Sequence, residues 1–194
     1  MSLLYPQSPF DTLPQLTTKR LILRKLSMRD ADDVFAYSRD PEVARHVLWD
    51  AHTSVGESRA YIRYMIRKYR QGEPASWGIE LKSTGRIIGT IGYMWYQRDN
   101  SAAEVGYSLS RAHWNQGLMS EALACVLDYS FRTLNIHRIE AQFEVNNPAS
   151  GRVMEKAGML FEGTLRGRLY NKGRYVDVSI YSALREDWRN RGGR

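Results

Sequence analysis

The order in which strand patterns and helix patterns alternate constrains the fold of this 194-residue chain more than any other feature. Alternating apolar residues predict strands at 20–26, 76–81, 87–96, 102–109, 138–145, 160–169 and 175–184. Helical apolar spacing between capping residues predicts helices at 27–38, 54–71, 118–134 and 148–157. The order β-α-α-β-β-β-α-β-α-β-β has no repeat or linker, and it predicts one α/β domain over 1–194 with helices packed on a central sheet.

The two ends of the chain fall outside this order. Residues 1–18 contain Pro6, Pro9 and Pro14 and are predicted to form an extended lead-in, and 189–194 a basic tail that frays beyond Trp188. The N-terminus lacks a basic start followed by an apolar block, and no apolar run approaches the ~20 residues that cross a bilayer. We therefore expect a cytoplasmic protein without a membrane partner.

Cysteine and histidine usage argues against disulfides and metal chemistry. The single cysteine, Cys125, excludes an intramolecular disulfide and a thiolate-rich metal site, and its apolar surroundings predict a buried structural thiol. The four histidines, His46, His52, His113 and His137, show no ligand spacing. We expect no metal cofactor.

The net charge of +7 favours an anionic partner, such as nucleic acid, an acidic surface or a polyphosphate cofactor. Against a nucleic-acid-binding module, no helix shows a dense basic face in the sequence and the motifs of standard nucleic-acid readers are missing. That module is the main alternative from another functional class.

The most informative segment is 105–122, VGYSLSRAHWNQGLMSEA, in which a predicted strand leads through a short loop into a helix. The first N–H groups of a helix lack internal partners, and Gly117 lets a phosphate approach them closely. His113, Asn115, Gln116 and Ser120 add donors. The segment is neither a Walker loop nor a dinucleotide fingerprint. It predicts a pyrophosphate cradle, the alternative being that Gly117 only turns a loop.

Several segments in order resemble the GNAT acetyltransferase superfamily, and in particular its RimJ/RimL-type branch, which acetylates the N-termini of ribosomal proteins. The run W-N-Q-G-L-M-S-E-A at 114–122 resembles the acetyl-CoA pyrophosphate loop of that family. The other matches are R-L-I-L-R at 20–24, A-E-V-G-Y at 103–107, N-N-P-A-S-G-R-V-M-E-K-A-G-M at 146–159, G-T-L-R at 163–166 and Y-S-A-L-R-E-D-W at 181–188. The loop departs from the family at Asn115-Gln116, where glycine and a base are frequent, and at Met119, where a small residue is usual.

The resemblance implies a mixed central sheet of six to seven strands with a splayed central pair, 102–109 and 138–145, flanked by about four helices. It implies an enzyme that transfers acetyl directly from acetyl-CoA to a primary amine, most plainly the N-terminal amine of a protein such as a ribosomal protein. Docking on the ribosome would fit that acceptor. A small amine acceptor (polyamine, amino sugar or amino-acid derivative) and a CoA-binding regulator without activity are the alternatives. The oligomeric state, monomer or homodimer, stays open.

The resemblance also assigns residues to the acetyl donor. The main-chain groups of Tyr107, Ser108 and Leu109 would bind the pantetheine arm, and the Leu109 amide is the candidate donor to the oxyanion. The remaining cofactor-binding candidates are Trp114, Asn115, Gln116, Gly117, Leu118, Met119, Ser120, Asn147 and Ser150.

Two side chains are candidates for the chemistry itself. Strand alternation places Glu104 on one face with Gly106 and Ser108, and Glu104 is the candidate general base; the alternative is a solvated acid on a sheet face. Ser150 falls at the third position of the helix opened by Asn147, where it could donate a hydrogen bond or a proton to the CoA sulfur. The alternatives are that Ser150 only serves first-turn amides and that Asn147 is a plain N-cap.

The acceptor pocket is the part that the sequence determines least. Trp49, Tyr170, Tyr175 and Asp177 are the candidates for its walls, from the region after the first helix and from the final hairpin. Acidic residues of the first helix, Asp30, Asp32 and Asp33, could attract a cationic amine.

Overall fold

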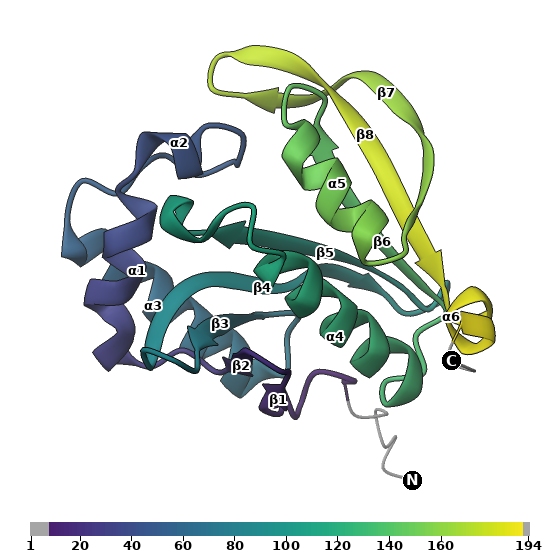
Figure 1. The fold of residues 1–194 in the computed structure, drawn as a ribbon, viewed down its shortest axis with the longest axis horizontal. Coiled ribbons are helices and arrows are strands. Elements are labelled where there is room, and N and C mark those ends of the chain that lie inside the picture. The colour runs from purple at the N-terminus through teal and green to yellow at the C-terminus, as the bar shows by residue number, and fades with distance from the viewer. Residues whose placement is uncertain (1–7, 192–194) are drawn as a thin grey trace, which may run out of the picture.

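The computed structural model describes residues 8–191, which form an eight-stranded sheet with helices on both faces (Figure 1). The strands are β1 (Leu16–Thr17), β2 (Leu21–Arg24), β3 (Ser76–Leu81), β4 (Arg86–Gln97), β5 (Ala102–Leu109), β6 (Arg138–Glu144), β7 (Leu160–Asn171) and β8 (Arg174–Leu184). Their order in the sheet is β1-β2-β3-β4-β5-β6-β8-β7. Only β5 and β6 pair in parallel, so the predicted mixed sheet is confirmed, with eight strands rather than six to seven.

Six α-helices lie within residues 8–191, where the sequence predicted about four. They are α1 (Ala31–Ser38), α2 (Pro41–Ala44), α3 (Val55–Gln71), α4 (Leu118–Arg132), α5 (Pro148–Lys156) and α6 (Arg185–Arg191), with short 3-10 helices at Met28–Asp30 and Arg111–His113. Helices α4 and α5 cover one face of the sheet, and α1 and α3 cover the other (Figure 1). No helix in this part of the chain is long and apolar enough to cross a membrane.

The long helices follow the apolar spacing that predicted them. In α4, Ala122, Leu123, Val126 and Leu127 are fully buried and form the stripe that packs on the sheet. Helix α3 ends at Gly72, whose φ of 62° is the left-handed conformation that commonly ends a helix.

The differences from the sequence prediction lie in short elements and at the ends. Residues 8–18 are extended, as predicted, but they are also packed on the domain, because Phe10 and Leu13 are buried in the core and β1 pairs with β2. The tail continues as α6 to residue 191, so the predicted fraying beyond Trp188 is wrong for this stretch. Residues 1–7 of the predicted lead-in and 192–194 of the predicted tail lie outside the described residues.

The central pair of strands is splayed, as the resemblance implied. Strands β5 and β6 pair only from Ala102 and Arg138 to Glu104 and Glu140, and then they diverge. Beyond that point β6 continues its pairing with β8 up to Glu144, while β5 continues with β4 up to Leu109. The last five residues of β5 therefore have a strand neighbour on one side only.

Candidate active site

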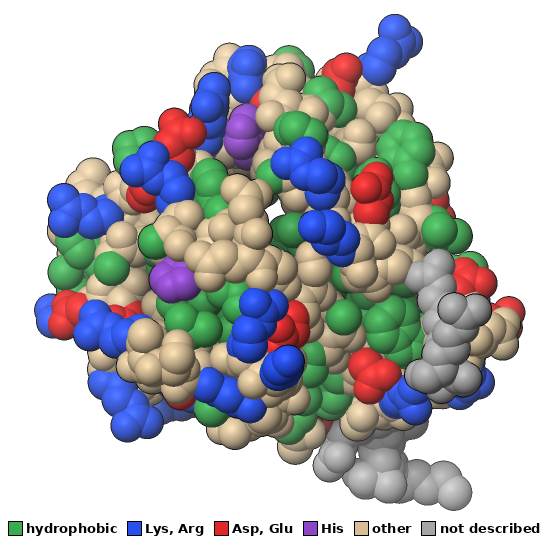
Figure 2. All heavy atoms as spheres, viewed as in Figure 1, with side chains coloured by type: hydrophobic (Ala, Val, Ile, Leu, Met, Phe, Trp, Pro, Cys, Tyr) green, Lys and Arg blue, Asp and Glu red, His purple; other side chains and the backbone are tan. Residues whose placement is uncertain are grey.

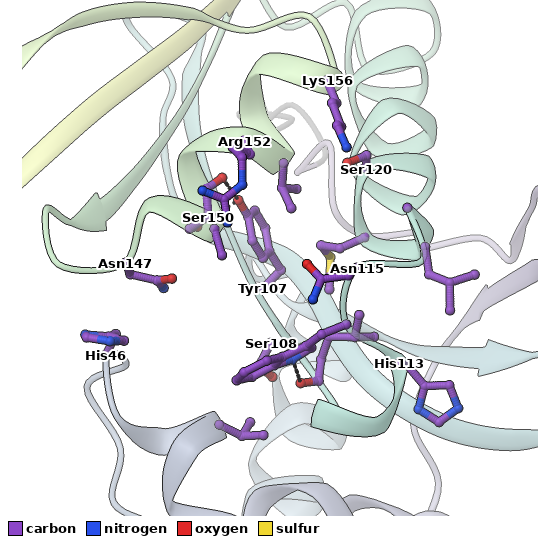
Figure 3. A pocket seen from close by; sticks show the side chains of 18 of the residues that line it. His46, Tyr107, Ser108, His113, Asn115, Ser120, Asn147, Ser150, Arg152 and Lys156 are labelled. Carbon is purple, nitrogen blue, oxygen red and sulfur yellow. Dashed lines mark hydrogen bonds between the residues drawn. The ribbon is translucent and has the colours of Figure 1, made fainter.

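A cleft of about 320 Å³ lies where the splayed strands, α4 and α5 meet. Its walls come from the end of β5, the loop after it, the first turn of α4, α5 and the region of α2. Figure 3 shows side chains from these separate elements converging on it. In Figure 2, the same face of the molecule is hollowed near its middle, with Lys and Arg side chains over α5 beside the hollow.

The N-terminus of α4 forms one end of this cleft. Gly117 is the N-cap residue with φ 71°, Asn115 has φ 59°, and no side chain caps the helix. The first helical hydrogen bond is from the Glu121 amide to the Gly117 carbonyl, so the amides of 118–120 have no partner inside the helix. A Cβ placed on Gly117 would meet its nearest atom, on Arg20, at 3.7 Å, which leaves open space in front of these amides. This end suits an anion.

A set of hydrogen bonds from Thr18 and Arg20 holds this loop in place. Arg20 Nη1 donates to the Gln116 carbonyl at 2.9 Å, and Arg20 Nε donates to Glu121 Oε2 at 2.7 Å. Thr18 Oγ1 donates to Glu121 Oε1 at 2.6 Å. Burial alone raises the pKa of Glu121, but these hydrogen bonds outweigh it and hold that pKa below its usual value. The loop is thus fixed to the residues that lead into β2.

Two basic side chains on α5 complete the anion-binding end. Arg152 and Lys156, one helical turn apart, line the cleft, and Figure 3 shows Lys156 pointing across it toward Ser120. His113 also lines the cleft, and its Nδ1 is buried without a partner among the described residues. The sequence analysis missed Arg152 and Lys156. Their spacing of four residues on the helix opened by Asn147 is the signal that could have found them.

The end of β5 exposes main-chain groups to the cleft on the side where β6 has diverged. The Ser110 amide donates to the Ile88 carbonyl of β4. The Ser108 carbonyl oxygen also faces β4, because a Cβ added to Gly89 of β4 would lie only 2.3 Å from it. By the alternation of an antiparallel pair, Tyr107 and Leu109 then turn their N–H and C=O groups away from β4. The main chain of Ser108 faces β4 instead, so Ser108 reaches the cleft only through its side chain.

The side chain of Trp114 forms a hydrogen bond with one of these main-chain groups. Its indole Nε1 donates to the Leu109 carbonyl at 2.8 Å. This bond folds the loop back onto the end of β5, and the Leu109 amide and the main-chain groups of Tyr107 remain turned toward the gap.

Ser150 and Tyr107 form a hydroxyl pair at the start of α5. The Tyr107 hydroxyl lies 2.9 Å from Ser150 Oγ and donates to the Ser150 carbonyl at 3.0 Å. Burial raises the pKa of Tyr107 above its usual value. Asn147 makes no capping hydrogen bond with its side chain, which lines the cleft. Ser150 and Asn147 thus both line the cleft. The Tyr107 hydroxyl lies there too, although the sequence analysis assigned only the main chain of Tyr107 to the site.

Glu104 lies on the other face of the sheet from Tyr107, outside the lining of the cleft, at the last β5 residue that pairs with β6. Its carboxylate accepts hydrogen bonds from Trp95 Nε1 at 2.6 Å and from Gln142 Nε2 at 3.0 Å. Burial raises the pKa of Glu104, and these two donors oppose the shift. Glu104 is therefore positioned at the fork of the splay, where β5 and β6 begin to diverge.

The chain is similar in sequence and in structure to known proteins. A family model described as an acetyltransferase (GNAT) domain matches residues 20–160. An uncharacterized N-acetyltransferase, p20, of Bacillus licheniformis is 36% identical over 173 residues, which cover 89% of this chain and 97% of that protein. The chain belongs to the GNAT acetyltransferase family.

More distant relatives agree with this assignment. The [ribosomal protein uS5]-alanine N-acetyltransferase of Escherichia coli is 29% identical over 90% of this chain and 92% of its own. Among solved structures, a GNAT acetyltransferase from Bacillus anthracis superposes with a TM-score of 0.80 at 25% identity, covering 89% of this chain and 99% of that one. The ribosomal L7/L12 α-N-protein acetyltransferase RimL in complex with coenzyme A has a TM-score of 0.79 at 22% identity, covering 88% and 98%.

As a GNAT enzyme, the protein is an acetyl-CoA-dependent N-acetyltransferase. The residues present fit that donor, because uncapped helix amides, open space at Gly117 and the cations of Arg152 and Lys156 suit its phosphates. Met119, the bulky departure from the family pattern, is 5% exposed and packs in the core. No group of three or more His, Cys, Asp or Glu side chains in residues 8–191 could hold a metal ion.

The predicted acceptor residues lie outside the lining of the cleft. Tyr170 and Tyr175 stack edge to face at the tip of the β7–β8 hairpin, where they are 61% and 75% exposed. Lys172 joins this tip to the Trp49 carbonyl at 2.9 Å, so three of the four candidates share one region. The fourth, Asp177, accepts a hydrogen bond from the Gly167 amide in the bulge of β7.

Two of the first-helix acids are also engaged elsewhere. Asp30 is paired with Arg24, and Asp33 is paired with Arg86. Their charges are largely offset within the N-terminal half of the fold.

A cluster that the sequence analysis missed lies at the end of β6. Glu144, with a side chain only 1% exposed, pairs with Arg174 Nη2 at 2.7 Å and His46 Nδ1 at 3.2 Å. His46 lines the cleft beside Asn147 (Figure 3). The cluster joins the region after α2 to the start of β8. Its members are 30 and 98 residues from Glu144 in sequence, so no local pattern could reveal it.

Proposed function

We propose that this acetyltransferase acts on the N-terminal α-amine of a protein, with a ribosomal protein as its acceptor. The observation that carries this proposal is the similarity, at 29% identity over 90% of the chain, to a [ribosomal protein uS5]-alanine N-acetyltransferase. Such an acceptor would place the activity in the cytoplasm.

The site residues take the following roles in this proposal. Glu104 removes the proton from the acceptor ammonium, because its carboxylate stands at the fork of the splay and burial raises its pKa toward the operating range. The Leu109 amide, turned away from β4, donates to the oxyanion as the amine attacks.

Acetyl-CoA supplies an acetyl thioester and a thiolate leaving group. Ser150 Oγ, paired with the Tyr107 hydroxyl, stabilises or protonates that sulfur. The remaining contacts serve binding. The first-turn amides of α4, Arg152, Lys156 and the side chain of Ser120 hold phosphate oxygens, and Tyr107 and Asn147 orient the pantetheine arm.

The test compares acceptors under identical conditions. Peptides with ribosomal-protein N-termini are offered with acetyl-CoA and thiol release is followed, alongside the same peptides with a blocked α-amine and an internal lysine. Polyamines and amino sugars form the third set. The proposal predicts release only with the free α-amine, with the acetyl group located there by mass spectrometry.

Three other outcomes would each replace the proposal. Release with small amines alone would make this a small-molecule acetyltransferase. Binding of acetyl-CoA without release to any amine would favour a regulator. Salt-dependent nucleic-acid binding without stabilisation by CoA would favour the nucleic-acid module.

A further inference from the structure

Four arginines form a stripe along α3, which corrects the expectation that no helix has a dense basic face. Arg59, Arg63, Arg67 and Arg70 are all exposed, and their spacing of four, four and three residues keeps them within roughly 80° of the helix circumference. Apolar residues between them, among them Ile62, Met65 and Tyr69, are buried on a different side of the helix. Because apolar residues separate the arginines in the sequence, the stripe becomes recognisable only when the residues are placed on the helix.

The stability of the helix does not explain this stripe. None of the four arginines makes an ion pair with a carboxylate in residues 8–191. Like charges three or four residues apart repel, and only Arg70, in the last turn, is favoured by the helix dipole. The one acid of α3, Glu57, is bound to Thr53. The stripe lowers helix stability, so its presence calls for a partner.

We propose that the arginine stripe of α3 binds the phosphodiester backbone of a nucleic acid without reading its base sequence. Guanidinium groups match phosphate oxygens in geometry and charge. The stripe from Arg59 to Arg70 spans ~16 Å at the rise of an α-helix, enough to follow several phosphates. A net charge of +7 adds a long-range attraction for a polyanion.

Other partners fit this face less well. A membrane-surface helix must present apolar side chains to the lipid, whereas the apolar side of α3 packs into the protein core. A protein interface has a core depleted in charge. The large hydrophobic side chain that α3 exposes is Tyr64. The Arg67 guanidinium and the Lys68 ammonium lie over its ring, 5.1 Å and 5.4 Å from the ring centroid.

The position of α3 keeps this surface apart from acetyl-CoA binding. Helix α3 covers the face of the sheet opposite to α4 and α5, which form the cleft (Figure 1). Nucleic acid bound there leaves the cleft open. The proposal is therefore independent of the acceptor proposed above and can fail or hold separately from it.

The experiment measures binding of a labelled RNA duplex and a DNA duplex of the same sequence, by fluorescence anisotropy, over a series of salt concentrations. The test variant carries Arg→Gln at Arg59, Arg63, Arg67 and Arg70. The control variant carries four changes to Gln at exposed cations elsewhere, at Lys19, Arg132, Arg166 and Arg189, so the net charge of the two variants is equal. A third variant carries Arg→Lys at the four stripe positions. Polyglutamate serves as a competitor without phosphate.

We expect the wild type to bind one or both duplexes, and the test variant to reduce the slope of log K against log salt by about 3 to 4, because four phosphate contacts are lost. The control and Arg→Lys variants keep the slope within about 1 of the wild-type value. Thiol release with a short acceptor peptide is the same in all four proteins. Equal slopes for test and control variants, no duplex binding at low salt, or displacement of the duplex by polyglutamate at equal charge concentration would each overturn the proposal.

Discussion

At the scale of single residues, the proposed mechanism depends on the protonation state of Glu104. A buried carboxylate with a raised pKa is a stronger base than an ordinary glutamate, but it must be ionised to act. Turnover should therefore fall as pH falls through the pKa of Glu104, which lies above the ordinary value of 4.5. The hydrogen bonds from Trp95 and Gln142 limit that rise because they favour the ionised form.

The substitution Trp95→Phe tests how far the hydrogen bond from Trp95 offsets the effect of burial on the pKa of Glu104. Loss of the Nε1 donor should raise the pKa of Glu104 further, so the acid limb of the kcat/KM–pH profile moves to higher pH, with little change on the plateau. The matched control is Trp188→Phe, which removes an indole bond of the same kind to Asp128, with α6 contacting α4. An acid limb that stays in place in Trp95→Phe would argue against Glu104 as the base.

The hydroxyl pair of Tyr107 and Ser150 should behave as one unit. Ser150→Ala should lower kcat by about tenfold or more, and Tyr107→Phe by a few-fold, with smaller effects on acetyl-CoA affinity. In the double variant the two losses should not multiply, because Tyr107 acts through Ser150. Steady-state kinetics of the three variants measure this. Multiplying losses would mean that the two hydroxyls act separately.

Sequence reasoning reached part of this site and could not reach the rest. Local rules predict the strand face of Glu104 and the helix position of Ser150, since both depend on neighbouring residues alone. The contact of Tyr107 with Ser150 joins residues 43 apart. It depends on how α5 packs against β5, which no local pattern contains.

At the scale of elements, we propose that the N-terminus of α4 binds the phosphates of the donor. Gly117→Ala should weaken acetyl-CoA binding by about tenfold, because a methyl group would fill the open space before the helix amides. Titration calorimetry measures the affinity. Gly85→Ala is the control, since Gly85 has a similar φ of 67°, lies in the β3–β4 turn and has nothing within 4 Å of an added Cβ. Equal affinity losses in the two variants would point to a general effect of backbone strain.

The elements that the sequence predicted correctly are the long ones. Helix α4 repeats its apolar spacing over four turns and α3 ends at a glycine, so both have strong local signals. Strand β1 has two residues and α2 has four, which is too short for any period. The burial of Phe10 and Leu13 in the predicted lead-in has no local signal, because the core that they enter is formed by strands distant in sequence.

At the scale of the whole molecule, the splayed sheet has two arms that are bridged beside the cleft. Glu144 on β6 binds His46 from the region after α2 and Arg174 on β8, and Lys172 in the hairpin tip binds Asp50. These bridges join the hairpin to the region that follows α2.

Arg174→Ala tests the importance of this bridge for stability. It should lower the free energy of unfolding by about 1–3 kcal/mol, because Glu144 would stay buried with weaker partners. Thermal unfolding would then shift down by several degrees for a chain of this size. Arg166→Ala on β7, an exposed arginine, is the control and should change little. An unchanged melting temperature in Arg174→Ala would mean that His46 and Asn146 suffice for Glu144.

The most direct test of the whole account is a thermal-shift titration with acetyl-CoA, followed by thiol release with an acceptor peptide, for the wild type and Glu104→Gln. We predict that acetyl-CoA raises the melting temperature of both proteins equally, since Glu104 lies outside the cleft lining. Only the wild type should then release thiol at an appreciable rate. No shift at millimolar acetyl-CoA, or equal thiol release by the two proteins, would contradict the account.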